Sequence, residues 1–434
     1  MPSLSEQINN YAGNNPVRFH MPGHKGVFDP LDLTELFFTD NLYSPDENLR
    51  IISDLETRVT QVFFARSDIK SSISCGGATL GIQAALLAAL RVNNIRINNI
   101  NDKKYIICAR DCHVSFINAL ALLDIEPLWV YGNFCGVFKR HANKNIIAAF
   151  ITAPDYYGSL RDVRETSQIC KKYNAPLIVD NSHGSHLAFY KGGGFHPINC
   201  GADISVDSVH KTLPALTGGA VIHARPEYNI REALKIFAST SPSFLILQSI
   251  EKMLDFLESD GTAEHSRLLQ DITGLKNNAP EFFLENYKSA DPFRIILNCA
   301  DFGEKLYYFL FGHNITCEFY EKDRVILIPS IFNKPSDFKV LADALQTFAL
   351  ENKIMREPVK IYNFAKPERA LSLSDAVKSP RELVKTSACT GRICAESIFA
   401  YPPGVPVILP GETIDAETIK IIKNLRDKIY IIKS

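Results

Sequence analysis

The chain has 434 residues, more than one hydrophobic core usually supports, so its length predicts at least two domains. Hydrophobic residues make up 46% and charged residues 22%, and the net charge of -1 gives no electrostatic reason to expect nucleic acid or an anionic membrane as a partner. The opening residues lack the apolar core of a signal peptide, and no apolar run is long enough to cross a bilayer. A cytoplasmic location is therefore expected, with the 10 cysteines as reduced thiols.

Short apolar strands alternate with amphipathic helices through the first two thirds of the chain. Strands that end in small or polar residues are predicted at 104–109, 145–152, 175–180 and 202–208, with a helix at 163–174. Continuous apolar strands that alternate with helices predict a mostly parallel sheet with both faces covered, which is an α/β fold. Ligands bind beyond the carboxyl ends of the strands in such sheets.

The pattern changes near residue 290, where shorter apolar stretches and a long helical stretch predict a smaller α/β domain. The last part of the chain, which includes 400–412, is predicted to be rich in turns, and the asparagine-rich stretch 91–102 is predicted to be a loop. The expected division is an N-terminal segment (1–50), a large cofactor-binding domain (51–290) and a small C-terminal domain (291–434).

Lys211 follows the strand predicted at 202–208, next to His210. It could be a helix-start lysine that points into water. Its place at the edge of the predicted sheet favours a lysine that is held for covalent chemistry, because a partly buried amine has a tuned pKa. Asp180 ends a neighbouring predicted strand, and a buried carboxylate needs a cationic partner. A protonated pyridine nitrogen would be such a partner.

Three other features bear on the type of ligand. A glycine pair opens the helical stretch that follows Ser74, which suits a phosphate but is also common in simple turns. His113 follows another strand and is either a structural histidine or a ring that stacks on a planar ligand. A metal site at Asp180, His183 and His186 is disfavoured, because the histidines lie in a glycine-containing loop with no carboxylate cluster nearby, so no metal is expected. Pyridoxal 5′-phosphate (PLP) is a cofactor that suits this combination of a lysine, an aspartate, a phosphate-binding helix start and a histidine.

Several long motifs occur in one order along almost the whole chain: "RFHMPGHKG", "TAPDYYGSLRDV", "VDNSHGSH", "DSVHKTLPALTGGA" and "GRICAESIFAYPPGVPVILPGE". This set resembles the bacterial Orn/Lys/Arg decarboxylases in their short form, within the PLP fold type I (aspartate-aminotransferase-like) superfamily. The resemblance implies a large domain with a mostly parallel, seven-stranded type of sheet covered by helices, a smaller C-terminal α/β domain, PLP as cofactor and a homodimer or higher homo-oligomer.

The resemblance also implies residue roles. Lys211 would bind PLP covalently, Asp180 would pair with the pyridine nitrogen, and His113 would stack on the ring with His183 on the Asp180 side. The phosphate would be held by residues of two loops, namely Gly77, Ala78, Thr79, Ser208 and His210. The segment 22–25 would lie near the active site of its own subunit or of the partner subunit. Substrate contacts are assigned to Ser115, His24, Lys25 and Glu396, of which Glu396 would take the distal amine.

The chain departs from the family pattern at several of these motifs. Ala78 lacks the hydroxyl, and Ile82 the amide, that the family usually has in the phosphate loop. Val114 replaces a lysine, and "DNS" replaces D-E-A after the strand that ends in Asp180. The loss of the hydroxyl at Ala78 predicts weaker cofactor retention.

The activity implied is decarboxylation of a basic amino acid to a polyamine precursor and CO2, with arginine the first choice and lysine and ornithine close behind. His210 or Lys211 would return the proton to Cα. One alternative is a different fold type I reaction, transamination or elimination. The presence of Arg392 does not decide between these reactions and decarboxylation. The other is a regulatory relative without turnover, against which the retained Lys211 argues.

Overall fold

A computed structural model describes residues 3–27, 31, 51–96, 103–131, 133–284, 291–354, 367–400 and 405–433. The predicted domain boundaries at 50 and 290 lie outside these residues, as do residues 97–102 of the asparagine-rich stretch and 401–404 of the turn-rich tail. The predicted domain division therefore stays a prediction.

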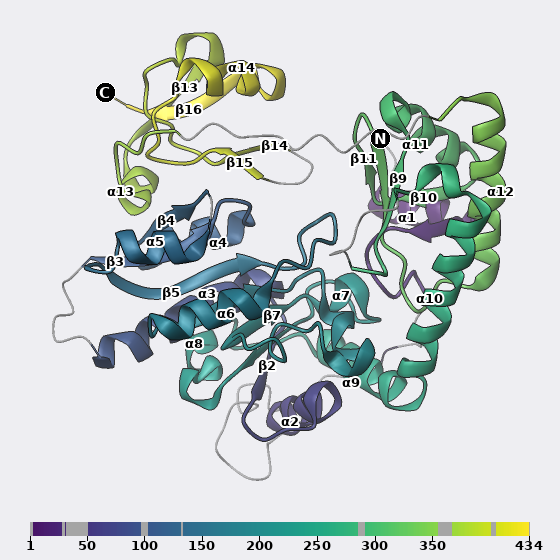
Figure 1. The fold of residues 1–434 in the computed structure, drawn as a ribbon, viewed down its shortest axis with the longest axis horizontal. Helices are drawn as coiled ribbons and strands as arrows, with labels where there is room; N and C mark the ends of the chain where they lie inside the picture. Colours follow the sequence, from purple (N-terminus) through teal and green to yellow (C-terminus); the bar gives the residue numbers. More distant parts are fainter. Residues whose placement is uncertain are drawn as a thin grey trace.

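A seven-stranded sheet forms the centre of the molecule (Figure 1). Its strands, in spatial order, are β2 (Lys70–Ser74), β8 (Ala220–Ala224), β7 (Ile204–Asp207), β6 (Leu177–Asp180), β5 (Asn145–Thr152), β3 (Lys104–Ala109) and β4 (Ile125–Val130). Only β8 runs antiparallel to its neighbours. The predicted mostly parallel sheet is confirmed, and two strands, β3 and β5, have the predicted bounds.

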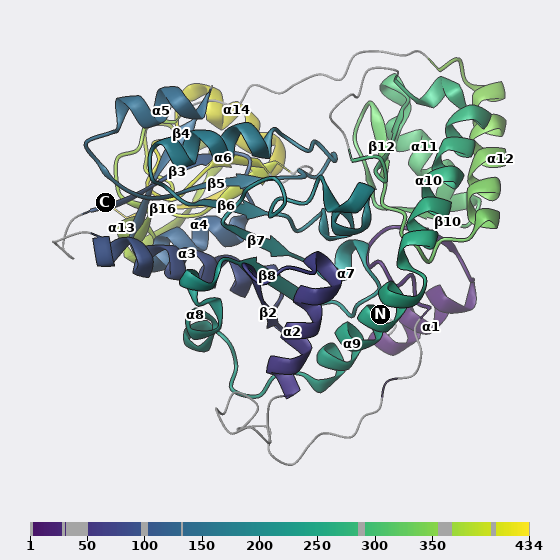
Figure 2. The same cartoon turned by 60° about the horizontal axis from the view of Figure 1, so that its bottom comes forward.

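Helices cover both faces of this sheet, as Figure 2 shows. One face carries α3 (Gly77–Arg96), α4 (Val114–Leu123) and α8 (Ile230–Phe237), and the other carries α5 (Phe134–Arg140) and α6 (Val163–Lys172). Successive residues of β5 show why, because side chains alternate between the faces of a strand. Ala148 and Phe150 belong to the hydrophobic cluster under α3 and α4, whereas Ala149 and Ile151 belong to the cluster under α5 and α6.

The long helix α3 corrects one prediction, since it continues through Arg96 into the stretch 91–102 that was expected to be a loop. Val92 packs against the core beneath α3, so the apolar face of the helix extends past Leu90. No glycine or proline occurs between Arg91 and Arg96 to end it.

A second, three-stranded antiparallel sheet has the order β11 (Phe319–Tyr320), β12 (Arg324–Leu327), β9 (Ile295–Asn298). It lies beside three helices, which are α10 (Gly261–Asn278), α11 (Gly303–Gly312) and α12 (Pro335–Glu351). The N-terminal segment joins this part of the molecule, because β1 (Val17–Phe19) pairs in parallel with β10 (Ile315–Cys317).

The C-terminal residues form a unit next to β4 and α4 with a hydrophobic cluster of its own, except that Leu373 and Leu409 pack in the cluster under α3 and α4. Its elements are α13 (Leu373–Lys378), β13 (Arg381–Lys385), β14 (Ile398–Ala400), β15 (Val405–Ile408), α14 (Ala416–Leu425) and β16 (Lys428–Ile432). The predicted turn-rich tail thus contributes to the β14–β15 hairpin. A buried ion pair joins this unit to the end of β3, since both terminal nitrogens of Arg110 lie 2.7 Å from the carboxylate oxygens of Glu412.

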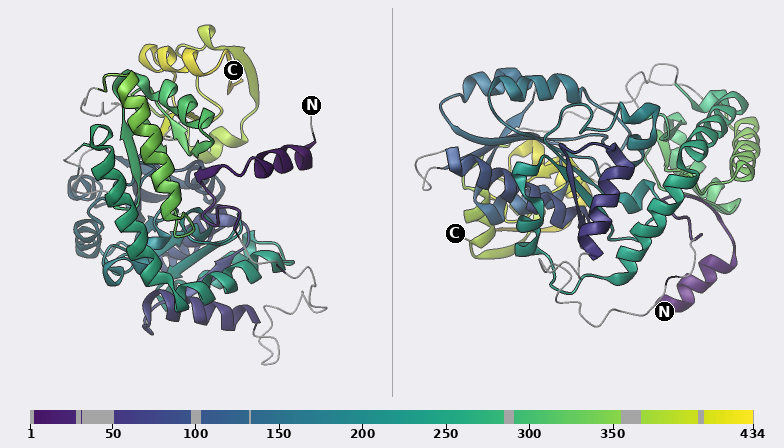
Figure 3. Two further views of the ribbon diagram at one scale, coloured as in Figure 1. Left: turned by 90° about the vertical axis from the view of Figure 1, so that its right-hand side faces the viewer. Right: turned by 90° about the horizontal axis from the view of Figure 1, so that it is seen from below.

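The remaining helices are α1 (Leu4–Gly13), α2 (Ile51–Phe64), α7 (Val209–Thr212) and α9 (Phe244–Ser259). Figure 3 shows α1 standing away from the rest of the molecule, and it has no buried residue. In the part of the chain that the structure describes, no helix combines the length and apolar character that a membrane span requires.

Candidate active site

Lys211 lies on the short helix α7, directly beyond the carboxyl end of β7. Its Nζ is 3.1 Å from Nε2 of His183, which comes from the loop after β6. Burial lowers the pKa of Lys211; the Asp180 and Glu318 carboxylates oppose this shift, and the Arg294 guanidinium adds to it. The amine therefore gives up its proton more readily than an ordinary lysine, as covalent chemistry requires.

Asp180 is the last residue of β6, and it is buried at the same edge of the sheet as Lys211. Its Oδ1 accepts hydrogen bonds from the hydroxyl of Ser182 at 2.5 Å and from the backbone N–H of Ser182 at 3.1 Å. Both bonds use one oxygen, so Oδ2 can accept a hydrogen bond from a protonated ring nitrogen. The loop after β6 thus holds the carboxylate in a fixed orientation.

His113 is the N-cap residue of α4, beyond the end of β3, and its side chain is exposed. Its Nδ1 accepts from the backbone N–H of Ser115 at 3.2 Å and lies 2.8 Å from the Ser115 hydroxyl. These two contacts fix the plane of the ring. Ser115, expected to touch substrate, is buried and instead orients His113. Val114 begins the helix and is only partly buried.

The phosphate loop connects β2 to α3. Gly77 has φ +70 with no atom near the place of a Cβ, and its N–H donates to Gly218 O at 2.8 Å. The following N–H groups at the start of α3 have no partner within the helix, which suits an anion. Thr79 is exposed at this point, whereas Ala78 and Ile82 are buried in the core beneath the helix.

The second phosphate-binding group expected lies at the start of α7. Ser208 is buried and is the N-cap residue of α7, and Nδ1–H of His210 donates to Gly219 O at 2.9 Å. Burial lowers the pKa of His210, and the neighbouring charge of Lys211 lowers it further. Hydroxyl, imidazole and helix-start N–H groups, with Asp180 and Lys211 nearby, form a donor set that fits PLP.

The segment 22–25 lies against the Lys211 loop of its own chain. The N–H of Gly23 donates to His210 O at 2.8 Å, and a Cβ at Gly23 would meet Leu213 O at 2.6 Å, so only glycine fits. Lys25 is buried and donates from Nζ to Ile328 O at 2.7 Å, and burial lowers its pKa to about 7. His24 accepts the N–H of Gly26 at 3.1 Å.

Glu396 lies in the C-terminal unit, where its side chain has other partners. Its Oε2 is 2.7 Å from Nη1 of Arg426, and its Oε1 accepts the N–H of Tyr430 at 2.7 Å. The structure therefore does not bring Glu396 together with the residues around Lys211 in the contacts described. Arg392 is in the same unit, with its Nη2 2.8 Å from Glu382 Oε1.

Three residues that the sequence reasoning missed also belong to the site. The hydroxyl of Tyr156 donates to Glu318 Oε1 at 2.8 Å, and the Tyr156 ring lies edge-on to His183 with the ring centroids 5.1 Å apart. Arg294, just before β9, has its Nη2 3.4 Å from Nδ1 of His183. Tyr156 could have been found from its place after β5, but Glu318 and Arg294 come from the second sheet, which the strand-end argument did not cover.

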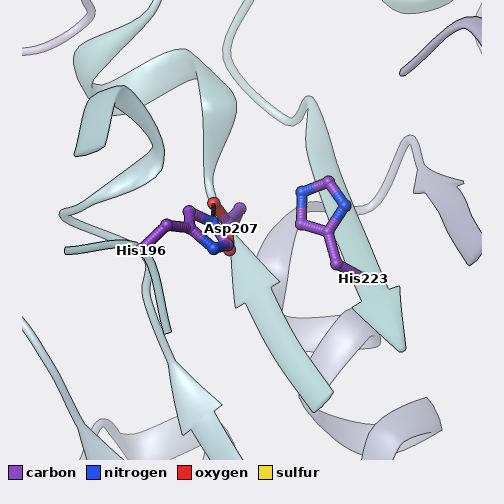
Figure 4. A group of neighbouring side chains, drawn as sticks. All are labelled: His196, Asp207 and His223. Atoms are coloured by element: carbon purple, nitrogen blue, oxygen red, sulfur yellow. Dashed lines mark hydrogen bonds and ion pairs between the residues drawn. The ribbon is translucent and has the colours of Figure 1, made fainter. Parts of the chain in front are cut away.

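A buried polar cluster lies beneath the Asp180 and Lys211 loops, formed by His196, Asp207 and His223 (Figure 4). The three side chains are close enough to hold a metal ion. However, Asp207 Oδ2 already lies 2.8 Å from Nδ2 of Asn181 and 3.0 Å from Nε2 of His196, and its Oδ1 accepts from Ser205 at 2.6 Å. Because His196 Nδ1 accepts the N–H of Ile198 at 3.3 Å, its Nε2 carries the proton and is a donor.

This arrangement is a hydrogen-bonded carboxylate rather than a set of free metal ligands. Burial alone would raise the pKa of Asp207, but the His196 and His223 imidazoles and the Ser205 hydroxyl hold it below its usual value. The two histidines that were considered as metal ligands from the sequence have different partners. His183 faces Lys211, whereas His186 Nε2 lies 3.0 Å from Asp291 Oδ1.

Family comparisons cover most of the chain. The model described as "Orn/Lys/Arg decarboxylase, major domain" matches residues 2–297, and "Orn/Lys/Arg decarboxylase, C-terminal domain" matches residues 350–430. The chain belongs to the Orn/Lys/Arg decarboxylase family. This membership confirms the predicted family and the predicted enzyme class, a decarboxylase of basic amino acids, in a family of PLP enzymes.

Individual relatives agree with this assignment. An arginine decarboxylase of Bacillus subtilis is 25% identical, with 96% of this chain and 92% of that protein covered. An uncharacterized Bacillus subtilis protein, YaaO, is 26% identical over 97% of this chain and 94% of its own length. The constitutive lysine decarboxylase of Escherichia coli has a similar fold, with a TM-score of 0.70 at 16% identity, covering 94% of this chain and 80% of that one.

Proposed function

We propose that this protein removes the α-carboxylate of arginine as CO2, with PLP bound at Lys211, and that lysine and ornithine are its next-best substrates. The observation that carries the proposal is the pairing of Lys211 with His183 beside Asp180, at the carboxyl ends of adjacent parallel strands. Arginine is preferred because several of the relatives similar over nearly their whole length are named arginine decarboxylases.

The residues at the strand ends divide the binding of PLP among them. Thr79, Ser208 and His210, with the N–H groups at the start of α3, hold the phosphate. Asp180 would keep a proton on the pyridine nitrogen, because a nearby buried carboxylate favours the charged form of that nitrogen. His113 would stack on the ring, with its orientation fixed by Ser115.

When bound, PLP supplies an aldehyde that takes the substrate amine and a ring that accepts the electrons released with CO2. Lys211 would hold the cofactor covalently before the substrate binds and would be a free amine when the substrate amine has taken its place. Lys211 or His210 would return the proton to Cα, and burial lowers the pKa of each of these groups. Tyr156 and Glu318 close the side of the site that faces the second sheet.

The product test is incubation of the purified protein with PLP and arginine, lysine or ornithine in turn, followed by mass spectrometry of amines and 2-keto acids and by measurement of CO2. The proposal predicts equal amounts of CO2 and amine, greatest with arginine. Keto acid without CO2 would show an aminotransferase, and no product with any substrate would favour a regulatory protein. A cytoplasmic homodimer is proposed as well, and sedimentation of the purified protein tests its assembly.

A further inference from the structure

Arg294 is a buried arginine next to the active-site lysine. Only 6% of its surface is exposed, and its Nε and Nη1 have no hydrogen-bond partner among the residues that the structure describes. The charge of Arg294 acts on the Asp155 and Asp291 carboxylates, but Asp291 Oδ1 lies 3.0 Å from His186 Nε2 and makes its ion pair there. A buried arginine with no carboxylate in direct contact among the described residues is costly, so a functional reason for it is needed.

Arg294 also borders a small cavity that His183 does not line. Arg294 lines a cavity of about 10 Å³, close to the room that one water molecule occupies. Three other buried atoms without partners among the described residues belong to residues that line the same cavity: His186 Nδ1, Thr212 Oγ1 and His265 Nε2. Water can satisfy these atoms, but it leaves the positive charge of Arg294 in place.

Among the described residues, Arg294 makes one side-chain hydrogen bond, and this bond fixes the proton on His183. A guanidinium can only donate, so His183 Nδ1, 3.4 Å from Arg294 Nη2, is the acceptor. Burial, the largest cause, together with the charge of Arg294, holds the pKa of His183 well below its usual value, so the ring is neutral and carries its single proton on Nε2. That N–H then donates to Lys211 Nζ, 3.1 Å away. An ammonium has no lone pair to accept this bond, whereas a neutral amine has one.

The charges around Lys211 act in opposite directions. Asp180 from the end of β6 and Glu318 from the segment between β10 and β11 favour the protonated amine, and Arg294 from before β9 opposes it. The other titratable groups that interact with Lys211 are the three histidines His113, His183 and His210. Arg294 is therefore the main positive group that offsets two carboxylates.

We propose that Arg294 is a positioning residue that, through His183, keeps Lys211 in its neutral and nucleophilic form. The role rests on the proposed function, in which Lys211 must attack an aldehyde. The lone pair of Nζ forms the bond to the aldehyde carbon, and the carbonyl oxygen leaves as water with the two protons of the amine. The protonated amine cannot begin this step.

Competitive acetylation tests the proposal without measuring turnover. The full chain, freed of cofactor by dialysis, is labelled with trace acetic anhydride over a pH series, and the label on Lys211 is measured by peptide mass spectrometry. Arg294→Gln is expected to lower labelling of Lys211 on the order of tenfold at neutral pH, because the protonated fraction of an amine rises when a nearby like charge is removed. At high pH the labelling should reach the wild-type plateau.

Three variants complete the test. Arg294→Lys keeps a charged donor and should restore most of the labelling, and His183→Phe should reproduce the loss because it breaks the relay. Arg66→Gln, which removes an exposed arginine paired with Asp68, should change nothing. An unchanged profile in Arg294→Gln, or a wild-type profile in His183→Phe, would overturn the proposal. If Arg294→Gln does not fold, His183→Phe decides. Failure of decarboxylation alone would leave these labelling results intact, so the two proposals fail separately.

Discussion

Asp207 and Arg294 are both buried charged side chains close to the active-site lysine, but their surroundings differ. The Asp207 carboxylate accepts hydrogen bonds from Asn181, His196 and Ser205, at 2.6 to 3.0 Å. Arg294 has one recorded side-chain contact, to His183, and two nitrogens with no partner among the described residues. A buried charge whose hydrogen bonds are all made stabilises the structure around it. A buried charge with unused hydrogen-bond donors still acts electrostatically on a neighbouring group.

The regions around Asp207 and Arg294 have different tasks. The Asp207 cluster lies between the strand ends that carry Asp180 and Lys211, because Asn181 follows Asp180 directly and Asp207 precedes Ser208. It holds the two loops in register. The Arg294 region acts on the chemistry of the amine. Substitutions in the first region should therefore affect folding, and those in the second should affect pH dependence.

The largest effect is expected at Lys211 itself, on which both regions converge. Lys211→Ala removes the only amine that the structure places beside Asp180 and His183 in the described residues, so CO2 release should fall to the uncatalysed level while the fold is kept. Borohydride reduction followed by peptide mass spectrometry measures covalent cofactor. If a reducible attachment persisted in the variant, Lys211 would be the wrong residue.

Asp180→Asn tests the electron sink. The amide keeps the shape of the side chain but removes the charge that favours a protonated pyridine. Turnover should fall on the order of 10²–10³-fold, the range seen when one preorganised electrostatic group is lost, with a much smaller change in PLP affinity. Turnover numbers and cofactor titrations measure the two separately. Near-wild-type turnover would mean that the electrons are accommodated differently.

Asp207→Asn should break the saturated cluster. It leaves buried donors facing an NH2 group, and disruption of a buried pair costs about 3–5 kcal/mol in the free energy of unfolding. Urea unfolding measures the change. The matched control is Asp343→Asn, at an exposed ion pair with Lys339, where about 0.2–1 kcal/mol is expected. Equal small losses in both variants would show that the cluster does not stabilise the fold.

The same cluster predicts a pH dependence of stability. The pKa of Asp207 is lowered in the folded protein, so its contribution is fully present above the pKa of an unfolded aspartate, about 3.9. That contribution is lost as the pH falls from there through the folded-state pKa. Wild-type protein should therefore lose more stability than Asp207→Asn in this acidic range, as measured by urea unfolding at each pH. Parallel losses would contradict the assignment.

The smallest effect is expected in the phosphate loop. Ala78→Ser can add one charge-assisted hydrogen bond to the phosphate, worth at most roughly 1.5–3 kcal/mol. The burial of Ala78 beneath α3 reduces that gain, because a hydroxyl there must turn out of the core. Dialysis of the two proteins side by side, followed by cofactor absorbance, measures dissociation. Identical loss rates would show that the missing hydroxyl does not limit retention.

The strand-end residues of the candidate site could be predicted from the chain because strand ends are visible in sequence. Lys211, Asp180 and His113 each follow an apolar run, and the edge of a parallel sheet collects such residues. Arg294 and Glu318 could not be found in this way, since they come from the second sheet and reach the site only through tertiary packing. Glu396 was assigned on its motif alone, and its contacts with Arg426 and Tyr430 depend on the fold of the C-terminal unit.

The most direct test of the comparison is the pH profile of Lys211 acetylation, measured in folded samples of wild type, Arg294→Gln and Asp207→Asn. We expect Arg294→Gln to move the onset of labelling to higher pH, because the group that opposes protonation is gone. Asp207→Asn should keep the wild-type profile in its folded fraction, since Asp207 acts on the structure. Superimposable profiles for wild type and Arg294→Gln, or a shift in Asp207→Asn as large as that in Arg294→Gln, would contradict the division of tasks between the two regions.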